Sequence, residues 1–168
     1  SDMVSFGVAP ALVMFEWAMK GMGKWGWIAA FIYCVGAALR LARFNTNIEV
    51  VDKRFFQGLP SPAAAALVAG FVWVLIDLNY TGEEVRWYAW ALTLFAGLTM
   101  VSNFRYYSGK DINLRRSVPF MAVLAIVLFF VLVSSYPPGI LFALFLCYAF
   151  SGYVMAAWGW IRRRNNLA

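Results

Sequence analysis

Histidine is absent from this chain of 168 residues, and cysteine occurs only twice. Without histidine the chain lacks the side chain that most often acts as a base near neutral pH and that most often binds zinc. Two cysteines are too few for a disulfide scaffold or for a metal site made of four thiolates. The sequence therefore excludes a small secreted protein held together by disulfides.

Charge is also scarce, because only 13% of the residues are charged while 63% are hydrophobic. Soluble globular domains have roughly half apolar and about a quarter charged residues. The chain also carries 15 Phe, 8 Trp and 8 Tyr, a large aromatic content for a soluble fold of this size. This composition excludes a disordered chain and predicts an integral membrane protein.

Long uncharged segments divide the chain into six candidate spans. A helix rises 1.5 Å per residue, so crossing a hydrocarbon core of ~30 Å takes about 20 apolar residues. The longest uncharged run, residues 117–161, is broken by Pro137, Pro138 and Gly139. Lipid requires each backbone amide to be paired within the protein, which favours helices. We therefore expect a single all-α membrane domain over 1–168, with transmembrane helices at about 3–20, 25–44, 61–80, 87–104, 117–136 and 139–161.

The basic residues are distributed unevenly between the two sides of such a bundle. Of the 14 Lys and Arg residues, 11 lie in 40–60, 105–116 and 162–164, and the other three are Lys20, Lys24 and Arg86. The positive-inside rule assigns the first group to the cytoplasm. These charges suit anionic lipid headgroups, so the net charge of +6 does not call for a nucleic-acid partner.

The chain begins on the side that this rule assigns to the cytoplasm. The first span starts almost at once, with no initiator methionine before it and no signal-peptide pattern. We therefore expect the sequence to be the C-terminal part of a longer protein.

Polar residues at that same side are the candidates for function. Asp2, at the mouth of the first span, fits either a helix cap or a catalytic carboxylate. Arg40 and Arg43 are three residues apart and share a helix face. They fit either interface anchors with extended side chains or a clamp for phosphate or carboxylate groups.

The third span opens on a serine followed by a proline. Ser61 is predicted to cap the helix, with Pro62 at the first helical position. The positive end of the helix dipole then faces the same interface, where an anion could bind. A simple capped helix start explains the pattern equally well.

Three segments together resemble a known family. The first, S-D-M-V-S-F-G-V-A-P-A at 1–11, resembles the end of the signature of the CDP-alcohol phosphatidyltransferases. That signature reads D-x-x-D-G-x-x-A-R, eight residues, then G-x-x-x-D-x-x-x-D. The stretches R-L-A-R-F-N at 40–45 and F-Q-G-L-P-S-P-A-A-A at 56–65 are similar to the branch whose acceptor alcohol is serine.

The resemblance implies a reaction between CDP-diacylglycerol and L-serine that gives phosphatidylserine and CMP. Asp2 matches the fourth carboxylate of the signature, which implies a general base beside divalent metal ions, Mg²⁺ or Mn²⁺. Arg40 and Arg43 would hold the lipid phosphate or the serine carboxylate, and Asn45 and Ser61 would supply neutral hydrogen bonds. The family also implies a homodimer in the bacterial cytoplasmic (inner) membrane, with the active site facing the cytoplasm.

The other signature aspartates and the A-R pair are not in this sequence, so we expect the chain to be inactive alone. Two alternatives remain. One is a sister enzyme that uses another acceptor alcohol, which the likeness of 56–65 to the serine branch disfavours. The other is a small membrane transporter or scaffold, although no span interior carries the charge pairs or broken helices of a substrate path.

Overall fold

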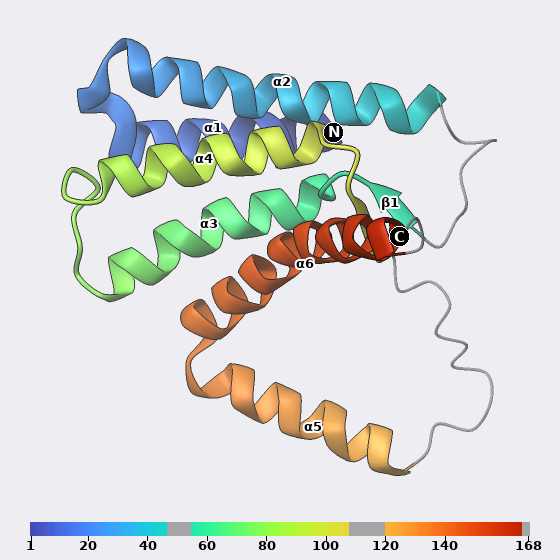
Figure 1. Ribbon diagram of the computed structural model, residues 1–168. Helices are drawn as coiled ribbons and strands as arrows, with labels where there is room; N and C mark the ends of the chain where they lie inside the picture. The colour runs from blue at the N-terminus through green and yellow to red at the C-terminus, as the bar shows by residue number, and fades with distance from the viewer. Residues whose placement is uncertain (47–54, 108–119, 166–168) are drawn as a thin grey trace.

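The computed structural model describes residues 1–46, 55–107 and 120–165. Within these residues the protein is almost entirely helical (Figure 1). The helices are α2 (Lys24–Thr46), α3 (Ser61–Asp77), α4 (Arg86–Val101), α5 (Phe120–Ser135) and α6 (Pro137–Asn165), preceded by a first helical segment. Each lies within a few residues of an expected span, which confirms the all-α fold class.

The first helical segment changes its winding along its length. It consists of η1 (Val4–Val8), α1 (Ala9–Met14), η2 (Phe15–Met19) and η3 (Lys20–Met22), of which η1 and η2 are π-helical. Pro10 has no amide hydrogen to offer the carbonyl of Phe6, four residues earlier. The hydroxyl of Tyr33 in α2 donates a hydrogen bond to this carbonyl at 3.0 Å. The unusual winding is therefore tied to α2 by a side chain.

Two of the helices meet the length and composition required of a transmembrane helix. They are α2 and the part of α6 from Pro137 to Arg162, whereas α3 and α5 are apolar but shorter. The predicted break at Pro137, Pro138 and Gly139 falls at the junction of α5 and α6. That all six segments cross a membrane remains a prediction.

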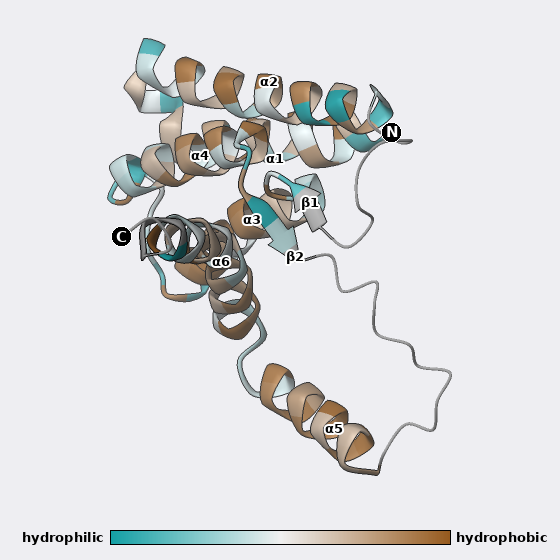
Figure 2. Ribbon diagram, turned by 45° about the vertical axis from the view of Figure 1, so that its right-hand side comes forward, coloured by the Kyte–Doolittle hydropathy of each residue, from teal (hydrophilic) through white to brown (hydrophobic). Residues whose placement is uncertain are grey.

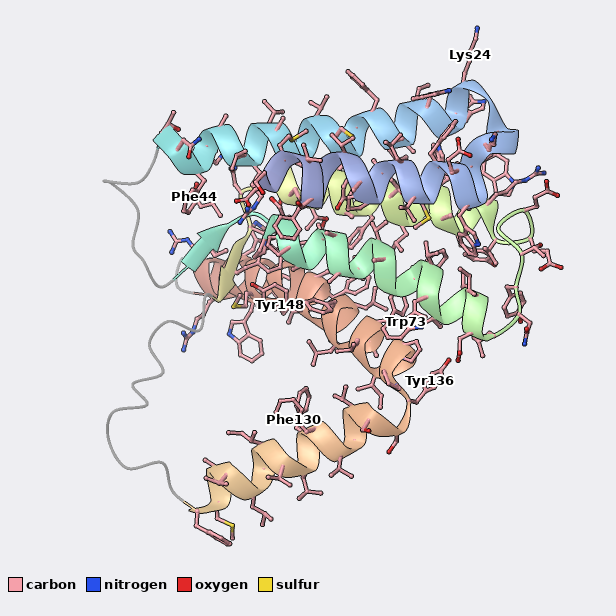
Figure 3. All side chains as sticks on the ribbon, turned by 180° about the vertical axis from the view of Figure 1, so that it is seen from behind. Lys24, Phe44, Trp73, Phe130, Tyr136 and Tyr148 are labelled. Carbon is pink, nitrogen blue, oxygen red and sulfur yellow. The ribbon has the colours of Figure 1, made fainter. Side chains whose placement is uncertain are left out.

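Helix α5 is apolar on every side and stands away from the other helices (Figures 1, 2 and 3). None of its residues is buried within the protein. A helix that is hydrophobic all round needs an apolar environment to cover it. The outward-facing apolar surfaces of α5 and of the rest of the bundle are those of a membrane protein.

The core between the remaining helices is built largely from small side chains. The buried alanines include Ala11, Ala29, Ala30, Ala37, Ala63, Ala64, Ala65, Ala89 and Ala96. Helices α2 and α4 pack backbone against backbone, because a Cβ added to Gly36 would stand 2.6 Å from the carbonyl oxygen of Gly97. Small residues at helix interfaces let backbones pack directly against one another.

We expect Gly36→Ala to destabilise the protein, because its methyl group would push α2 away from the backbone of α4. The expected loss is about 1–3 kcal/mol, the range for overpacking a tight contact. Denaturant unfolding in detergent micelles measures it. Gly21→Ala is the control, since a Cβ there meets nothing within 4 Å. Equal stability of Gly36→Ala and the wild type would contradict the backbone contact.

A short antiparallel ladder joins two connections between helices, which the sequence analysis did not anticipate. Strand β1 (Phe55–Gln57) pairs with β2 (Arg105–Tyr107), and Phe56 stands opposite Tyr106. The ladder thus links the segment before α3 to the segment after α4. It lies at the end of the bundle where α2 and α4 finish and α3 begins (Figure 1), called the ladder end below.

Candidate functional site

The candidate residues Asp2 and Arg40 lie at the same end of the bundle, the ladder end. A Cβ added to Gly7 would stand 3.1 Å from the Cβ of Ala37, so these two residues are level on neighbouring helices. Asp2 precedes Gly7 by five residues, and Arg40 follows Ala37 by three. Because the two helices run in opposite directions (Figure 1), these offsets of about 7 and 5 Å lead to the same end of the bundle.

The carboxylate of Asp2 is exposed, and the helix already begins at this residue. The carbonyl of Ser1 accepts hydrogen bonds from the amides of Val4 and Ser5. In the described part of the chain Lys20 and Glu16 form an ion pair at 2.8 Å. The Asp2 side chain forms neither an ion pair nor a hydrogen bond with these residues. Asp2 is therefore accessible and carries a charge with no protein partner among these residues.

A metal site cannot be assembled around Asp2 from the described residues. No group of three His, Cys, Asp or Glu side chains gathers anywhere among them. Magnesium keeps about six oxygen ligands in near-ideal octahedral geometry. One exposed carboxylate does not fit that requirement by itself, so the described residues do not show how a divalent cation would be held.

Arg40 is half-buried between α2 and the start of α3. Its Nη1 donates a hydrogen bond to Oγ of Ser61 at 3.1 Å. Its Nε is buried and has no hydrogen-bond partner among the described residues. A buried donor left unpaired costs on the order of 1–3 kcal/mol, and more when the group is charged. Arg40 therefore has a donor that no described residue satisfies.

The predicted capping role of Ser61 is wrong. Helix α3 begins at Ser61 itself, so Pro60 occupies the N-cap position and no side chain caps the helix. Pro60 has an extended ψ of 135°, which sets the entry of the chain into the helix. Oγ of Ser61 accepts a hydrogen bond from the guanidinium of Arg40 instead. Hydrogen bonds from a charged donor are stronger than those between neutral groups, which favours this pairing.

Arg43 does not join Arg40 in one clamp, because its hydrogen bonds go to the end of α4. Its Nη1 donates to the carbonyl of Val101 at 3.2 Å and to Oδ1 of Asn103 at 3.1 Å. A cation at a helix C-terminus satisfies carbonyls that have no partner within the helix. Asn45 is exposed and hydrogen-bonds none of these groups. The structure thus pairs Arg40 with Ser61 and leaves Arg43 and Asn45 apart from that pair.

The turn before α3 requires glycine at one position. Gly58 has a φ of +76°, and a Cβ there would collide with the carbonyl oxygen of Met100. Its amide donates to the carbonyl of Phe104 at 2.8 Å, and the amide of Leu59 donates to the carbonyl of Thr99 at 3.2 Å. These bonds fix the start of α3 against the end of α4. The G-L-P sequence at 58–60 is a local pattern that could have indicated this turn.

The aromatic groups behind this turn were missed by the sequence analysis. Tyr106 is fully buried, and its hydroxyl donates to the carbonyl of Ala149 in α6 at 2.8 Å. Burial raises the pKa of Tyr106, and the neighbouring Tyr153 and Tyr148 raise it further. The hydroxyl therefore remains protonated and keeps donating this hydrogen bond. Thr99 and Tyr153 form a second link to α6, with 2.7 Å between their hydroxyl oxygens.

Comparison with known proteins supports the motif resemblance, although no family model matches the chain. The chain is 35% identical over 116 residues to a protein of Helicobacter pylori (strain J99), covering 67% of this chain and 48% of that protein. It is 38% identical over 106 residues to a protein of Methanocaldococcus jannaschii, covering 63% and 45%. It is 28% identical over 143 residues to a protein of Mycobacterium leprae, covering 81% and 47%.

All three of these proteins are named CDP-diacylglycerol–serine O-phosphatidyltransferase. The chain spans about half the length of the curated relatives it matches. The motifs at 1–11, 40–45 and 56–65 predicted this relationship. The chain is accordingly related by sequence to the phosphatidylserine synthases of the CDP-alcohol phosphatidyltransferase family.

Proposed function

We propose that the protein acts in phospholipid biosynthesis by transferring the phosphatidyl group of CDP-diacylglycerol to the hydroxyl of L-serine. The products are phosphatidylserine and CMP. The names of its relatives support this reaction. One structural observation carries the proposal for this chain: Arg40 keeps a buried N–H that has no partner among the described residues, at the end of the bundle that also holds Asp2.

Asp2 is proposed to act as the general base. A serine hydroxyl is a weak nucleophile, and a carboxylate that accepts its proton promotes attack on phosphorus. The serine oxygen forms a bond to the phosphorus of the phosphatidyl group, the bond from that phosphorus to CMP breaks, and the proton goes to the carboxylate. The exposure of Asp2 and its lack of a protein partner among the described residues suit this role.

Arg40 is proposed to bind a substrate anion. The diphosphate of CDP-diacylglycerol and the carboxylate of serine each present two or more oxygens that a guanidinium group can bind through paired hydrogen bonds. The bond to Ser61 fixes the orientation of the guanidinium before a ligand arrives. Asn45 and Ser61 are proposed to supply neutral hydrogen bonds. The bonds of Arg43 to α4 favour a structural role over a substrate contact.

A divalent cation, Mg²⁺ or Mn²⁺, belongs to this proposal through the family resemblance. By the resemblance Asp2 stands where the signature places a ligand, and no group of three His, Cys, Asp or Glu side chains gathers among the described residues. When bound, such a cation would neutralise charge on the diphosphate. A chelator is expected to abolish activity, and added Mg²⁺ or Mn²⁺ to restore it.

The proposed setting is the bacterial cytoplasmic membrane, crossed by all six helical segments, with the ladder end facing the cytoplasm. Arg40, Arg43, Arg105 and Arg162 belong to the side that the positive-inside rule assigns to the cytoplasm. Glu16, Asp77, Glu83 and Glu84 belong to the other side. The homodimer is proposed from the family resemblance alone.

The experiment measures release of CMP from CDP-diacylglycerol by membranes that contain the intact protein. We expect release to depend on L-serine and not on glycerol 3-phosphate or inositol phosphate. Release that depends on one of the other alcohols instead would identify a sister enzyme. No release with any acceptor, in membranes where the folded protein is present, would overturn the enzymatic proposal in favour of a transporter or scaffold.

A further inference from the structure

The phenol ring of Tyr106 rests directly on Gly152 of α6. A Cβ added at Gly152 would stand 2.6 Å from Cε1 and 2.7 Å from Cε2 of this ring, closer than real Cβ contacts. The ring cannot swing aside easily, because Tyr106 is fully buried and its hydroxyl is bonded to the carbonyl of Ala149. Gly152 therefore leaves the space that the ring occupies, and a side chain at this position would overlap the ring.

Tyr106 belongs to strand β2, which pairs with β1, the strand that leads into the turn before α3. Tyr106 stands opposite Phe56 in the ladder, so its position fixes that of β1. The chain then continues from β1 into Gly58, whose amide is bonded to Phe104 two residues before Tyr106. The position of α6 is in this way transmitted to the turn through the ladder.

A second link leads from α6 to the same turn. The hydroxyl of Tyr153 is bonded to Oγ1 of Thr99, and the carbonyl of Thr99 accepts the amide of Leu59. Both links therefore end within three residues of Ser61, the side chain that holds Arg40. The pair proposed to bind substrate has its orientation set by a helix that begins more than 70 residues later in the chain.

We infer that Tyr106 and Gly152 are positioning residues of the candidate site, which orient the Arg40–Ser61 pair through the β1–β2 ladder. The inference rests on the proposed function in so far as Arg40 binds a substrate. Neither residue touches the reacting groups. If the contact served packing alone, disturbing it would lower stability and leave substrate binding as it was.

The test compares Gly152→Ala with Gly159→Ala in the intact protein. Both glycines lie on α6, but a Cβ at Gly159 meets nothing within 4 Å. We expect Gly152→Ala to raise the KM for one substrate by about tenfold or more and to change kcat much less, because small misplacements of a binding group are costly. The substrate affected should be the one whose KM rises in Arg40→Lys. Gly159→Ala should leave both constants unchanged.

Hydrogen exchange of residues 58–64, measured without substrate, gives a second readout that does not need activity. In Gly152→Ala the amides of Gly58 and Leu59 should exchange faster than in the wild type, and in Gly159→Ala they should not. Should Gly152→Ala fail to fold, Tyr106→Phe decides the question, since it keeps the ring and removes only the bond to Ala149. It should show the same changes to a smaller extent.

Unchanged exchange and unchanged KM values in a folded Gly152→Ala, or in Tyr106→Phe where that variant is the one that folds, would overturn the inference. Equal effects of the two glycine substitutions would overturn it as well. A wild-type protein that releases no CMP in the presence of serine would overturn the proposed function instead. In that case the exchange measurement alone would still decide whether α6 positions the turn.

Discussion

Replacing Asp2 by asparagine should reduce serine-dependent CMP release by about 10²–10⁴-fold, the usual contribution of a general base. Asparagine keeps the size and the hydrogen-bonding oxygen of aspartate but cannot accept the proton from the serine hydroxyl. The fold should be unaffected, because the Asp2 side chain is exposed and has no partner among the described residues. Initial rates in membranes, together with unfolding in detergent, measure the two effects separately.

Glu16→Gln is the matched control for Asp2→Asn. It removes the same charge from an exposed carboxylate in the same helical segment, and Glu16 forms an exposed ion pair with Lys20. Exposed ion pairs contribute little to stability, so both the fold and the kinetic constants should stay as they are. Full activity of Asp2→Asn would remove Asp2 from the role of base. Equal losses in the two variants would indicate an effect of net charge.

The helices were predictable because the signals that define them are local. An uncharged run of sufficient length, ended by a charge or by Pro-Pro-Gly, marks each helix in the sequence itself. The break before α6 and the start of α3 were found in this way. The winding of the first segment was not, because it involves the distant Tyr33, whose hydroxyl donates to the carbonyl of Phe6 that Pro10 leaves without an amide partner.

The hydrogen-bond partners within the candidate site could not be predicted from a single sequence. Spacing alone placed Arg40 and Arg43 on one face, where they fit either interface anchors or one clamp, whereas their bonds go to α3 and to the end of α4. The Ser-Pro pattern predicted a cap for Ser61 because only its neighbours in the chain were considered. Tyr106 packs against Gly152, which lies 46 positions later in the chain, and no local sequence pattern marks such a contact.

Arg40→Lys should raise the KM for one substrate by about tenfold or more, a loss of at least ~1.4 kcal/mol of binding. Lysine keeps the positive charge but has no counterpart to Nε and cannot present a planar fork of donors. A change in KM with little change in kcat is expected, because Arg40 is proposed to hold the anion equally in the ground and transition states. Titration of CDP-diacylglycerol and of serine in turn identifies which substrate Arg40 binds.

Arg43→Lys, three residues further along α2, separates a substrate contact from a structural one. Its donors serve the carbonyl of Val101 and the side chain of Asn103, so the substitution should lower stability by about 1 kcal/mol and leave both KM values unchanged. Lysine still places a cation at the C-terminus of α4, which limits the loss. If Arg43→Lys raised the same KM as Arg40→Lys, the two arginines would act together on one anion, and the assignment of Arg43 to the helix end would fall. Because the two guanidinium groups have separate partners, we expect Arg40→Lys to change a KM and Arg43→Lys to change the free energy of unfolding.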